Sequence, residues 1–211
     1  MANGKYRLFG AKGGGSMIVE AAIVRAQLPV EYVDLQWDEI GWDSRTLATL
    51  NPLGQVPTLE LPDGTVMTES AAMILHFAER APAARLVPPT THPTHVAFLR
   101  WLVFLVAAVY PTFTYGDDPK RWLDGDEEIG KRLRASTDEH RNKLWRYVEG
   151  QVRGPWFLGD TWSALDLYVW QMSLWRPGRE WFKGECPKLH TIGATMHVDP
   201  TCKAVATRNG Y

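Results

Sequence analysis

The stretch NPLGQVPTLELPDGTVMTES, residues 51–70, decides the fold of this chain. Two runs that favour β-structure, residues 58–61 and 65–67, flank Pro62-Asp63-Gly64. Asp-Gly between such runs is a strong hairpin signal, because both residues tolerate a positive φ. A helix-forming run follows Glu69-Ser70, where Ser70 can cap the helix and Glu69 lies beside its positive end. The stretch predicts a loop, a β-hairpin and the start of a helix.

Val56-Pro57, at the entry to the first of these strands, is the unusual feature. Proline cannot donate to a sheet ladder, so it belongs at the first residue or the edge of a strand. If the bond is cis, the backbone N–H and C=O of Val56 face outward and can pair with an extended ligand. This short stretch would then bring together a free backbone edge, a carboxylate, a hydroxyl and a helix N-terminus. Such a combination suits a small peptide ligand that carries both an amine and a carboxylate. A plain hairpin and capped helix without a ligand is the alternative.

The run Asn-Pro-x-Gly-x-Val-Pro-x-Leu, then Asp-Gly and Glu-Ser, resembles the glutathione-binding half of the glutathione S-transferase family. The resemblance implies that Val56 and a cis Pro57 pair with the cysteinyl unit of glutathione. It implies that Glu69 and Ser70 hold the γ-glutamyl amine and carboxylate, and that Gln55 approaches the glycyl end or the backbone nearby.

Upstream of this stretch the sequence predicts a βαβ unit. Tyr6–Phe9 and Glu31–Leu35 favour short strands, and Pro29 ends the helix between them. The apolar positions of that helix recur at helical spacing: Met17, Ala21, Val24 and Leu28. Strand, helix and strand imply a right-handed parallel unit. Together with the hairpin and the following helix, the order is βαβ–ββα, which is that of the thioredoxin-like fold.

Ser16 is the candidate catalytic residue. It falls at the start of the first helix, where unpaired N–H groups and the macrodipole favour an anion. Its hydroxyl can donate a hydrogen bond to a thiolate, and a free thiol titrates near ~8.5, so most of it is unreactive at neutral pH. A plain N-cap serine is the alternative. A backbone N–H of the same turn is a second candidate for activating the thiol.

The glycines before Ser16 satisfy neither the Walker motif nor the dinucleotide fingerprint, so they are expected to let the backbone approach a ligand. Transferases of the family use Tyr, Ser or Cys in this loop, and no Cys or Tyr occurs between Leu8 and Val30. The resemblance therefore implies a helix-start serine and argues against thiol exchange through an enzyme cysteine. Lys12 is a further candidate for the catalytic residue; a lysine that is merely solvated is the alternative.

Residues 37–50 connect the βαβ unit to the hairpin. In the family this segment often offers a basic or aromatic side chain to the glycyl carboxylate, so the resemblance implies Arg45 or Trp42 in that role.

The second half of the chain is expected to be all-helical. Prolines and weak periodicity predict a linker over 81–92, between a thioredoxin-like glutathione-binding domain (1–80) and a helical domain (93–211). One apolar helix is expected over 94–110, stopped near Pro111. A second amphipathic helix is expected from Ile129, Leu133, His140, Leu144, Tyr147 and Val148. Two short helices are expected near 189–196 and 201–208.

Between the two long helices, Tyr110, Phe113 and Tyr115 lie on a stretch broken by proline and glycine. They are expected to line the apolar pocket for the electrophile, which the family builds from this part of the chain; local loop packing is the alternative. Ser163-x-x-Asp166 predicts a capping box with a structural function only.

Composition narrows the functional classes. The net charge of −1 gives no basic field for nucleic acid or an anionic membrane. The start of the chain is polar, and the most apolar run, 102–109, is shorter than a membrane span. Two cysteines without Cys-x-x-Cys or zinc spacing indicate idle thiols in a reducing cytoplasm and no metal.

These observations lead to one main functional expectation. A glutathione transferase would use glutathione as co-substrate, conjugate its thiolate to a hydrophobic electrophile in detoxification, and resemble its family in forming a cytoplasmic homodimer. A non-catalytic protein of the same fold, acting as a ligand carrier or assembly module, is the first alternative. A glutathione-dependent isomerase or dehalogenase is the second.

Overall fold

The computed structural model describes residues 4–41, 44–124 and 127–211. Two compact units divide these residues: one runs to Val87 and includes Thr195–Tyr211, and the other is Pro88–Ala194. The division differs from the expected helical domain of 93–211, because the last residues pack with the first unit through helix α9 (Pro200–Arg208), which contacts α1 (Ser16–Arg25).

The first unit is a four-stranded mixed sheet with helices. Its strands lie in the order β2-β1-β3-β4, with β1 parallel to β2 and antiparallel to β3, and β3 antiparallel to β4. The remaining bounds are β1 (Tyr6–Gly10), β2 (Val30–Asp34), η1 (Trp37–Glu39), β3 (Thr58–Glu60), β4 (Val66–Met67), α2 (Ser70–Arg80) and η2 (Pro82–Ala84). This confirms the predicted thioredoxin-like βαβ–ββα order.

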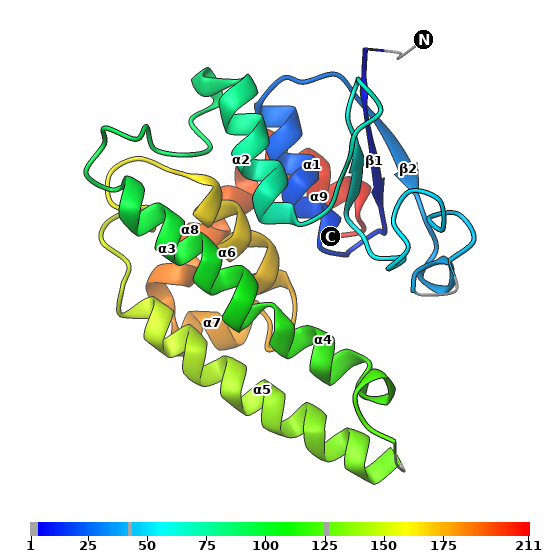
Figure 1. Cartoon of the computed structure of the whole chain (residues 1–211). Coiled ribbons are helices and arrows are strands. Elements are labelled where there is room, and N and C mark those ends of the chain that lie inside the picture. Colours follow the sequence, from blue (N-terminus) through cyan, green and yellow to red (C-terminus); the bar gives the residue numbers. More distant parts are fainter. Residues whose placement is uncertain (1–3, 42–43, 125–126) are drawn as a thin grey trace. The chain divides into compact units, whose positions relative to one another are not determined.

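Helices α1, α2 and α9 lie side by side against the sheet, as Figure 1 shows for their ribbons. Tyr6 of β1 packs edge-on against Phe77 of α2, with ring centroids 5.8 Å apart. Because α1 lies between the sheet, α2 and α9, its residues from Ser16 to Ile23 are all buried. Of the predicted apolar positions, Met17 and Ala21 are buried and Val24 is 40% exposed. Leu28 is only partly buried and lies outside the helix, because α1 ends at Arg25 and not at Pro29 as predicted.

The segment between β2 and β3 packs on another part of the sheet. Leu47 is fully buried in a cluster with Phe9 of β1 and Leu35. This small second core fixes the connection that leads into the loop before Val56. The predicted position of Trp42 lies outside the described residues.

The second unit is built of helices. Its elements are α3 (His95–Phe104), the π-helical segment η3 (Leu105–Val109), α4 (Pro111–Asp117), η4 (Pro119–Arg121), α5 (Glu127–Glu149), α6 (Ala164–Leu174), α7 (Arg179–Glu185) and α8 (Pro187–Val198), which ends beyond the unit's last residue. The expectation of a helical region after the first domain is confirmed.

Pro111 does not stop the first long helix, contrary to the sequence prediction. It occupies the first position of α4, where proline's missing N–H is not needed. The widened turn before it closes with a hydrogen bond from Tyr110 N–H to Leu105 O at 2.9 Å. The aromatic residues from 110 to 115 therefore lie on or beside a helix, not on a broken loop.

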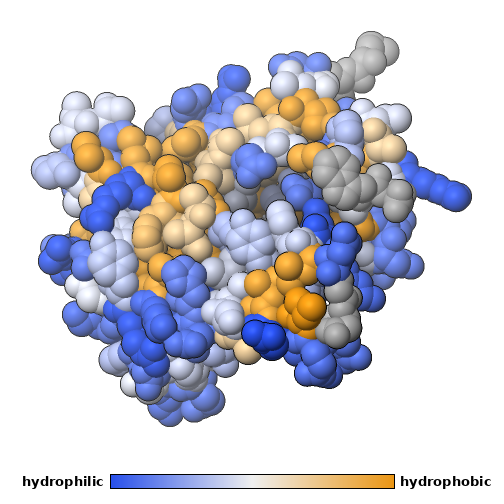
Figure 2. Space-filling model, turned by 60° about the horizontal axis from the view of Figure 1, so that its bottom comes forward, coloured by the Kyte–Doolittle hydropathy of each residue, from blue (hydrophilic) through white to orange (hydrophobic). Residues whose placement is uncertain are grey.

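The resulting continuous run, His95–Asp117, is long and apolar enough to cross a membrane by length and composition alone, since an 18-residue stretch within it has a mean hydropathy of 1.8. The run 102–109 is by itself shorter than a membrane span, and the longer apolar stretch arises because the helix continues past Pro111. A core helix passes the same test, and Phe98, Trp101 and Leu102 are buried in the second unit. Apolar side chains also reach the surface in patches among charged ones, as Figure 2 shows.

Helix α5 turns a different face to the core than its periodicity predicted. His140 and Tyr147 are exposed, and the buried positions are Arg141, Trp145 and Val148. Arg141 is only 1% exposed; it donates from Nη2 to Asp138 at 2.7 Å and lies over the Phe113 ring at 4.3 Å. A pattern of apolar residues does not include a buried arginine, so the sequence placed the core-facing side of α5 on other residues.

The predicted capping box of α6 is present. Asp166 accepts from the backbone N–H of Ser163 at 2.7 Å and of Phe157 at 2.9 Å, and burial raises the pKa of this carboxyl to about 6. Cys186 and Cys202 are free and buried, and burial raises the pKa of each thiol to about 12.

Candidate active site

The candidate site lies at the end of the sheet where β1 stops and β3 begins. Phe9 of β1 is opposite Thr58 of β3, so the next residue, Gly10, is level with Pro57. Leu59 of β3 is opposite Met67 of β4. Because the two strands are antiparallel, the end of β4 at Met67 lies at the same end of the sheet as the start of β3 at Thr58, and Glu69 follows Met67 by two residues. The topology therefore brings the loop after β1, the Val-Pro pair and the start of α2 to one end of the sheet.

Val56 presents a free backbone edge there. The Val56–Pro57 peptide bond is cis, as the family pattern implied. Among the described residues, neither the N–H nor the C=O of Val56 has a hydrogen-bond partner. Val56 is only partly buried. An extended peptide can therefore pair with it as an added strand.

The loop before Val56 is held by buried polar side chains. Asn51 donates from Nδ2 to the carbonyl of Gln55 at 3.1 Å and to Thr58 Oγ1 at 2.9 Å, and the Thr58 hydroxyl donates to the same carbonyl at 2.8 Å. Asn51 is 4% exposed and Thr58 fully buried. Sequence reasoning gave neither residue a role, although Asn51 opens the family pattern. The Gln55 side chain is exposed beside Val56.

Glu69 precedes α2 in a conformation that costs energy. Its φ is +66°, a region that non-glycine residues rarely adopt. It occupies the N-cap position without a side-chain cap, and Ser70 is the first helical residue, so the predicted capping by Ser70 was wrong. The Glu69 carboxylate is exposed and has no partner within the described part of the chain. It is available to a ligand amine.

The start of α1 offers backbone donors. The N–H groups of Gly15 and Ser16 have no partner among the described residues, whereas Met17 N–H bonds to Gly14 O at 3.2 Å. Free N–H groups at a helix N-terminus favour a bound anion.

The hydroxyl of Ser16 is directed elsewhere. It donates to the carbonyl of Ala11 at 3.2 Å, and Ser16 is fully buried. A Cβ on Gly10 would lie 2.6 Å from the Ser16 side chain, so that side chain packs against the end of β1. The catalytic role of the Ser16 hydroxyl stays a prediction, and this geometry favours the backbone alternative.

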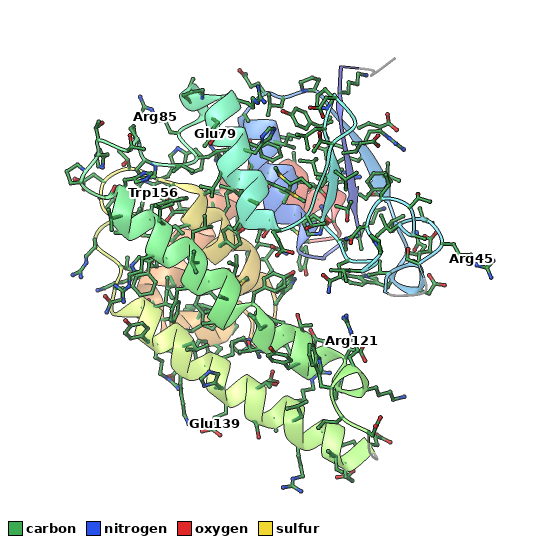
Figure 3. All side chains as sticks on the ribbon, viewed as in Figure 1. Arg45, Glu79, Arg85, Arg121, Glu139 and Trp156 are labelled. Carbon is green, nitrogen blue, oxygen red and sulfur yellow. The ribbon has the colours of Figure 1, made fainter. Side chains whose placement is uncertain are left out.

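Trp37 stands against the glycine loop. A Cβ on Gly14 would lie 3.0 Å from Ala11 O and 3.1 Å from Cη2 of the indole, so a larger residue at this position would require the loop or the indole to shift. Trp37 is 63% exposed at the start of η1. It was not singled out from the sequence, because the chain contains many tryptophans and most were expected in the core. Lys12 is exposed, and Arg45 points away from the strands into solvent (Figure 3). The roles of Lys12 and Arg45 remain predictions.

The three aromatics predicted for the electrophile pocket belong to the second unit and do not form one group. Tyr110 and Phe113 both pack edge-on against Trp175, at 5.6 and 5.0 Å between ring centroids. Phe113 is 4% exposed, and Tyr115 packs instead on Trp122 at 4.7 Å. Trp175 was not singled out from the sequence. It follows directly after α6, which is buried from Ala164 to Ser173.

A separate cavity of about 520 Å³ lies beside α4 and α5, and its lining does not include the three aromatics. Within residues 4–41, 44–124 and 127–211, no cluster of three or more His, Cys, Asp or Glu side chains is placed to hold a metal ion.

The chain combines a thioredoxin-like unit, in which a cis proline follows the free backbone of Val56, with a helical unit. This combination is that of proteins with a glutathione-binding fold. A family model described as glutathione S-transferase, N-terminal domain, matches residues 18–80. The uncharacterized GST-like protein YncG of Escherichia coli is 36% identical over 205 residues, covering 96% of this chain and 98% of that protein. The chain belongs to the glutathione S-transferase family.

Two further likenesses agree with that assignment. Glutathione S-transferase GstA of Escherichia coli is 28% identical over 127 residues, covering 60% of this chain and 59% of that protein. A glutathione transferase homologue from sulfitobacter, crystallised with bound glutathione, has a TM-score of 0.85 at 26% identity, covering 99% of this chain and 100% of that one. The family match begins after Ser16, so it does not bear on the loop that would meet the thiol.

Proposed function

We propose that the protein binds glutathione along Val56 and transfers its thiolate to a hydrophobic electrophile. The backbone of Val56 pairs with the cysteinyl unit, the Glu69 carboxylate takes the γ-glutamyl amine, and Ser70 takes the γ-glutamyl carboxylate. Gln55 lies toward the glycyl end. The observation that carries this proposal is that, among the described residues, the N–H and C=O of Val56 have no partner, at the end of the sheet where the Glu69 carboxylate also has none.

The thiol loses its proton at the start of α1, where the sulfur accepts hydrogen bonds from the N–H groups of Gly15 and Ser16. Each pKa unit of thiol acidification requires about 1.4 kcal/mol of preference for the anion. Charge-assisted hydrogen bonds and the helix terminus are each of that order. The thiolate then attacks the electrophilic carbon and a C–S bond forms. The displaced electron pair leaves with the halide of an aryl halide, or stays on the oxygen of an opened epoxide or of the enolate of an unsaturated carbonyl, which then takes up a proton from solvent.

Calorimetric titration with glutathione tests the binding half of the proposal. Glu69→Gln removes the charge that faces the amine and is expected to weaken glutathione binding roughly tenfold to a hundredfold. Glu79→Gln is the matched control, because Glu79 is an exposed residue near the far end of α2 (Figure 3). Absence of binding by the unaltered protein at millimolar glutathione would reject the proposal.

A non-catalytic glutathione-binding protein is the second candidate function. It is favoured by the buried Ser16 hydroxyl and by the absence of Cys and Tyr from residues 9–29. Conjugation measured against a panel of aryl halides, epoxides and unsaturated carbonyls separates the two. Glutathione binding without turnover of any electrophile would support the non-catalytic function.

Tyr110, Phe113 and Tyr115 remain our candidates for the electrophile pocket, with Tyr110 the strongest. Its ring is only partly buried, whereas Phe113 is enclosed under Arg141. Tyr110→Ala is expected to raise KM for the electrophile several-fold and to leave glutathione affinity unchanged. An unchanged KM would exclude Tyr110 from that pocket.

We further propose that the protein is a cytoplasmic homodimer that acts in detoxification. Val96, Leu99 and Val103 form an apolar row on one face of α3, and they are 76%, 38% and 61% exposed. Such a row fits a second copy of the chain. Sedimentation analysis of a Val96→Glu, Val103→Glu variant should show a monomer, whereas the control Leu123→Glu should not change the oligomeric state.

A further inference from the structure

The glycine loop before α1 is held by a residue from the other end of the chain. Asn209 follows α9 and is 6% exposed. Its Oδ1 accepts from the backbone N–H of Gly13 at 3.0 Å. Gly13 has a φ of +74°, and a Cβ there would lie 3.6 Å from the Tyr211 hydroxyl oxygen. The C-terminal residues therefore contact the loop on the side of Gly13.

The same amide group also binds the helix that the loop leads into. Asn209 Nδ2 donates to Glu20 Oε2 at 3.0 Å and to the carbonyl of Val205 at 2.9 Å. Glu20 lies one turn beyond Ser16 in α1 and is 3% exposed. A buried carboxylate requires partners, and Arg208 supplies the second one at 3.1 Å. One side chain thus joins the loop, the second turn of α1 and the end of α9.

We propose that Asn209 is a positioning residue for the thiol site, which it serves by fixing the Gly13 backbone relative to α1. This inference rests on the proposed binding of glutathione at the start of α1. The loop has its own anchor as well, since Gly14 N–H donates to Ala11 O at 3.0 Å. That anchor fixes the loop internally, and the Asn209 bond fixes it against the rest of the unit. The N–H groups of Gly15 and Ser16 are then held ready for the sulfur before it arrives.

Arg208 provides a matched control for this role. It contacts the same Glu20 carboxylate, bonds to Asp34 Oδ1 at 2.6 Å, and lies over the Tyr32 ring at 4.3 Å. Arg208→Ala weakens the attachment of α9 to α1 and β2 but leaves the bond between Asn209 and Gly13 in place. A purely structural Asn209 would give a variant that resembles Arg208→Ala.

The test measures the thiol pKa of bound glutathione, glutathione affinity and kcat/KM in the full-length protein. Asn209→Ala is expected to raise that pKa and to lower kcat/KM by about tenfold to a hundredfold, because a misplacement near 1 Å has effects of that size. Glutathione affinity should change little, since Val56 and Glu69 remain. Arg208→Ala should lose stability but keep the thiol pKa of the unaltered protein.

Equal thiol pKa values in the two variants would overturn the positioning role. If Asn209→Ala fails to fold, Tyr211→Ala replaces it. Tyr211 is 44% exposed, so the substitution is tolerated, and a smaller rise of the same pKa is expected. An unchanged pKa in Tyr211→Ala would then count against the proposal. Failure of the unaltered protein to bind glutathione would instead reject the proposed function itself.

Discussion

Replacing Ser16 with alanine separates the two ways of activating the thiol. The Ser16 hydroxyl donates one hydrogen bond, to Ala11 O at 3.2 Å, in a fully buried position. Its removal leaves no orphaned acceptor, because Ala11 O still accepts from Gly14 N–H. The expected loss of unfolding free energy is therefore about 1 kcal/mol, that of one neutral hydrogen bond.

The effect on the thiol follows from the same geometry. The Ser16 hydroxyl is bound to Ala11 O, so in the proposed mechanism the sulfur is held by backbone N–H groups, which alanine retains. The pKa of bound glutathione should stay the same, and kcat/KM should change by no more than about twofold. If the hydroxyl instead bonds to the thiolate, its loss costs roughly 2 kcal/mol and raises that pKa by more than one unit.

Titration of the thiolate by its ultraviolet absorbance, with conjugation rates measured across neutral pH, decides between these outcomes. Ser173→Ala is the matched control, because its buried hydroxyl also donates to a carbonyl, that of Trp170 at 2.8 Å, in the other unit. Both variants should lose similar stability. A pKa increase above one unit in Ser16→Ala alone would refute the backbone mechanism and restore the hydroxyl to the catalytic role.

Three further predictions concern stability and reactivity. The pKa of Asp166 is about 6 in the folded protein and 3.8 for an unperturbed aspartate side chain. Between these pH values the folded state binds more protons than the unfolded state, so the contribution of this carboxyl to the free energy of unfolding falls as the pH rises. The stability difference between the unaltered protein and Asp166→Asn should thus shrink by about 1 kcal/mol from pH 5 to pH 7 in urea titrations, and growth of that difference would contradict burial as the dominant cause. Gly54→Ala should destabilise by several kcal/mol in thermal unfolding, because the new Cβ would lie 1.6 Å from Gly41 O, whereas Gly64→Ala, at φ +87° with open space, should cost only about 1–2 kcal/mol; equal losses would discount the clash. The two buried cysteines, each with a pKa of about 12, should react with an aromatic disulfide reagent only after unfolding, and fast labelling of the native protein would show them accessible.

The first unit was predictable because its signals are local. The Val-Pro pair, the Asp-Gly turn and the strand periods each depend on neighbours in sequence, and the thioredoxin-like order followed from them. Asn51 bonds to Gln55 and Thr58 within its own loop, and Trp37 lies beside Gly14 of an earlier loop. Neither contact leaves a periodic pattern in the sequence. The position of Glu69 at the sheet edge was implied by the family motif, but its positive φ was not.

The second unit was predicted less well for physical reasons. Pro111 was interpreted as a stop, yet proline is favoured at the first position of a helix, and the widened turn before it keeps the helix continuous. The face of α5 was misplaced because Arg141 is buried with Asp138. Asn209 carried no signal at all, since its partners Gly13 and Glu20 are almost the whole chain away.

The bond between Gly13 and Asn209 joins positions 196 apart. During synthesis the glycine loop leaves the ribosome early and lacks this partner until translation has reached residue 209. A nascent chain that has not reached residue 209, or a product terminated before it, lacks the bond that joins Gly13 to the end of α9.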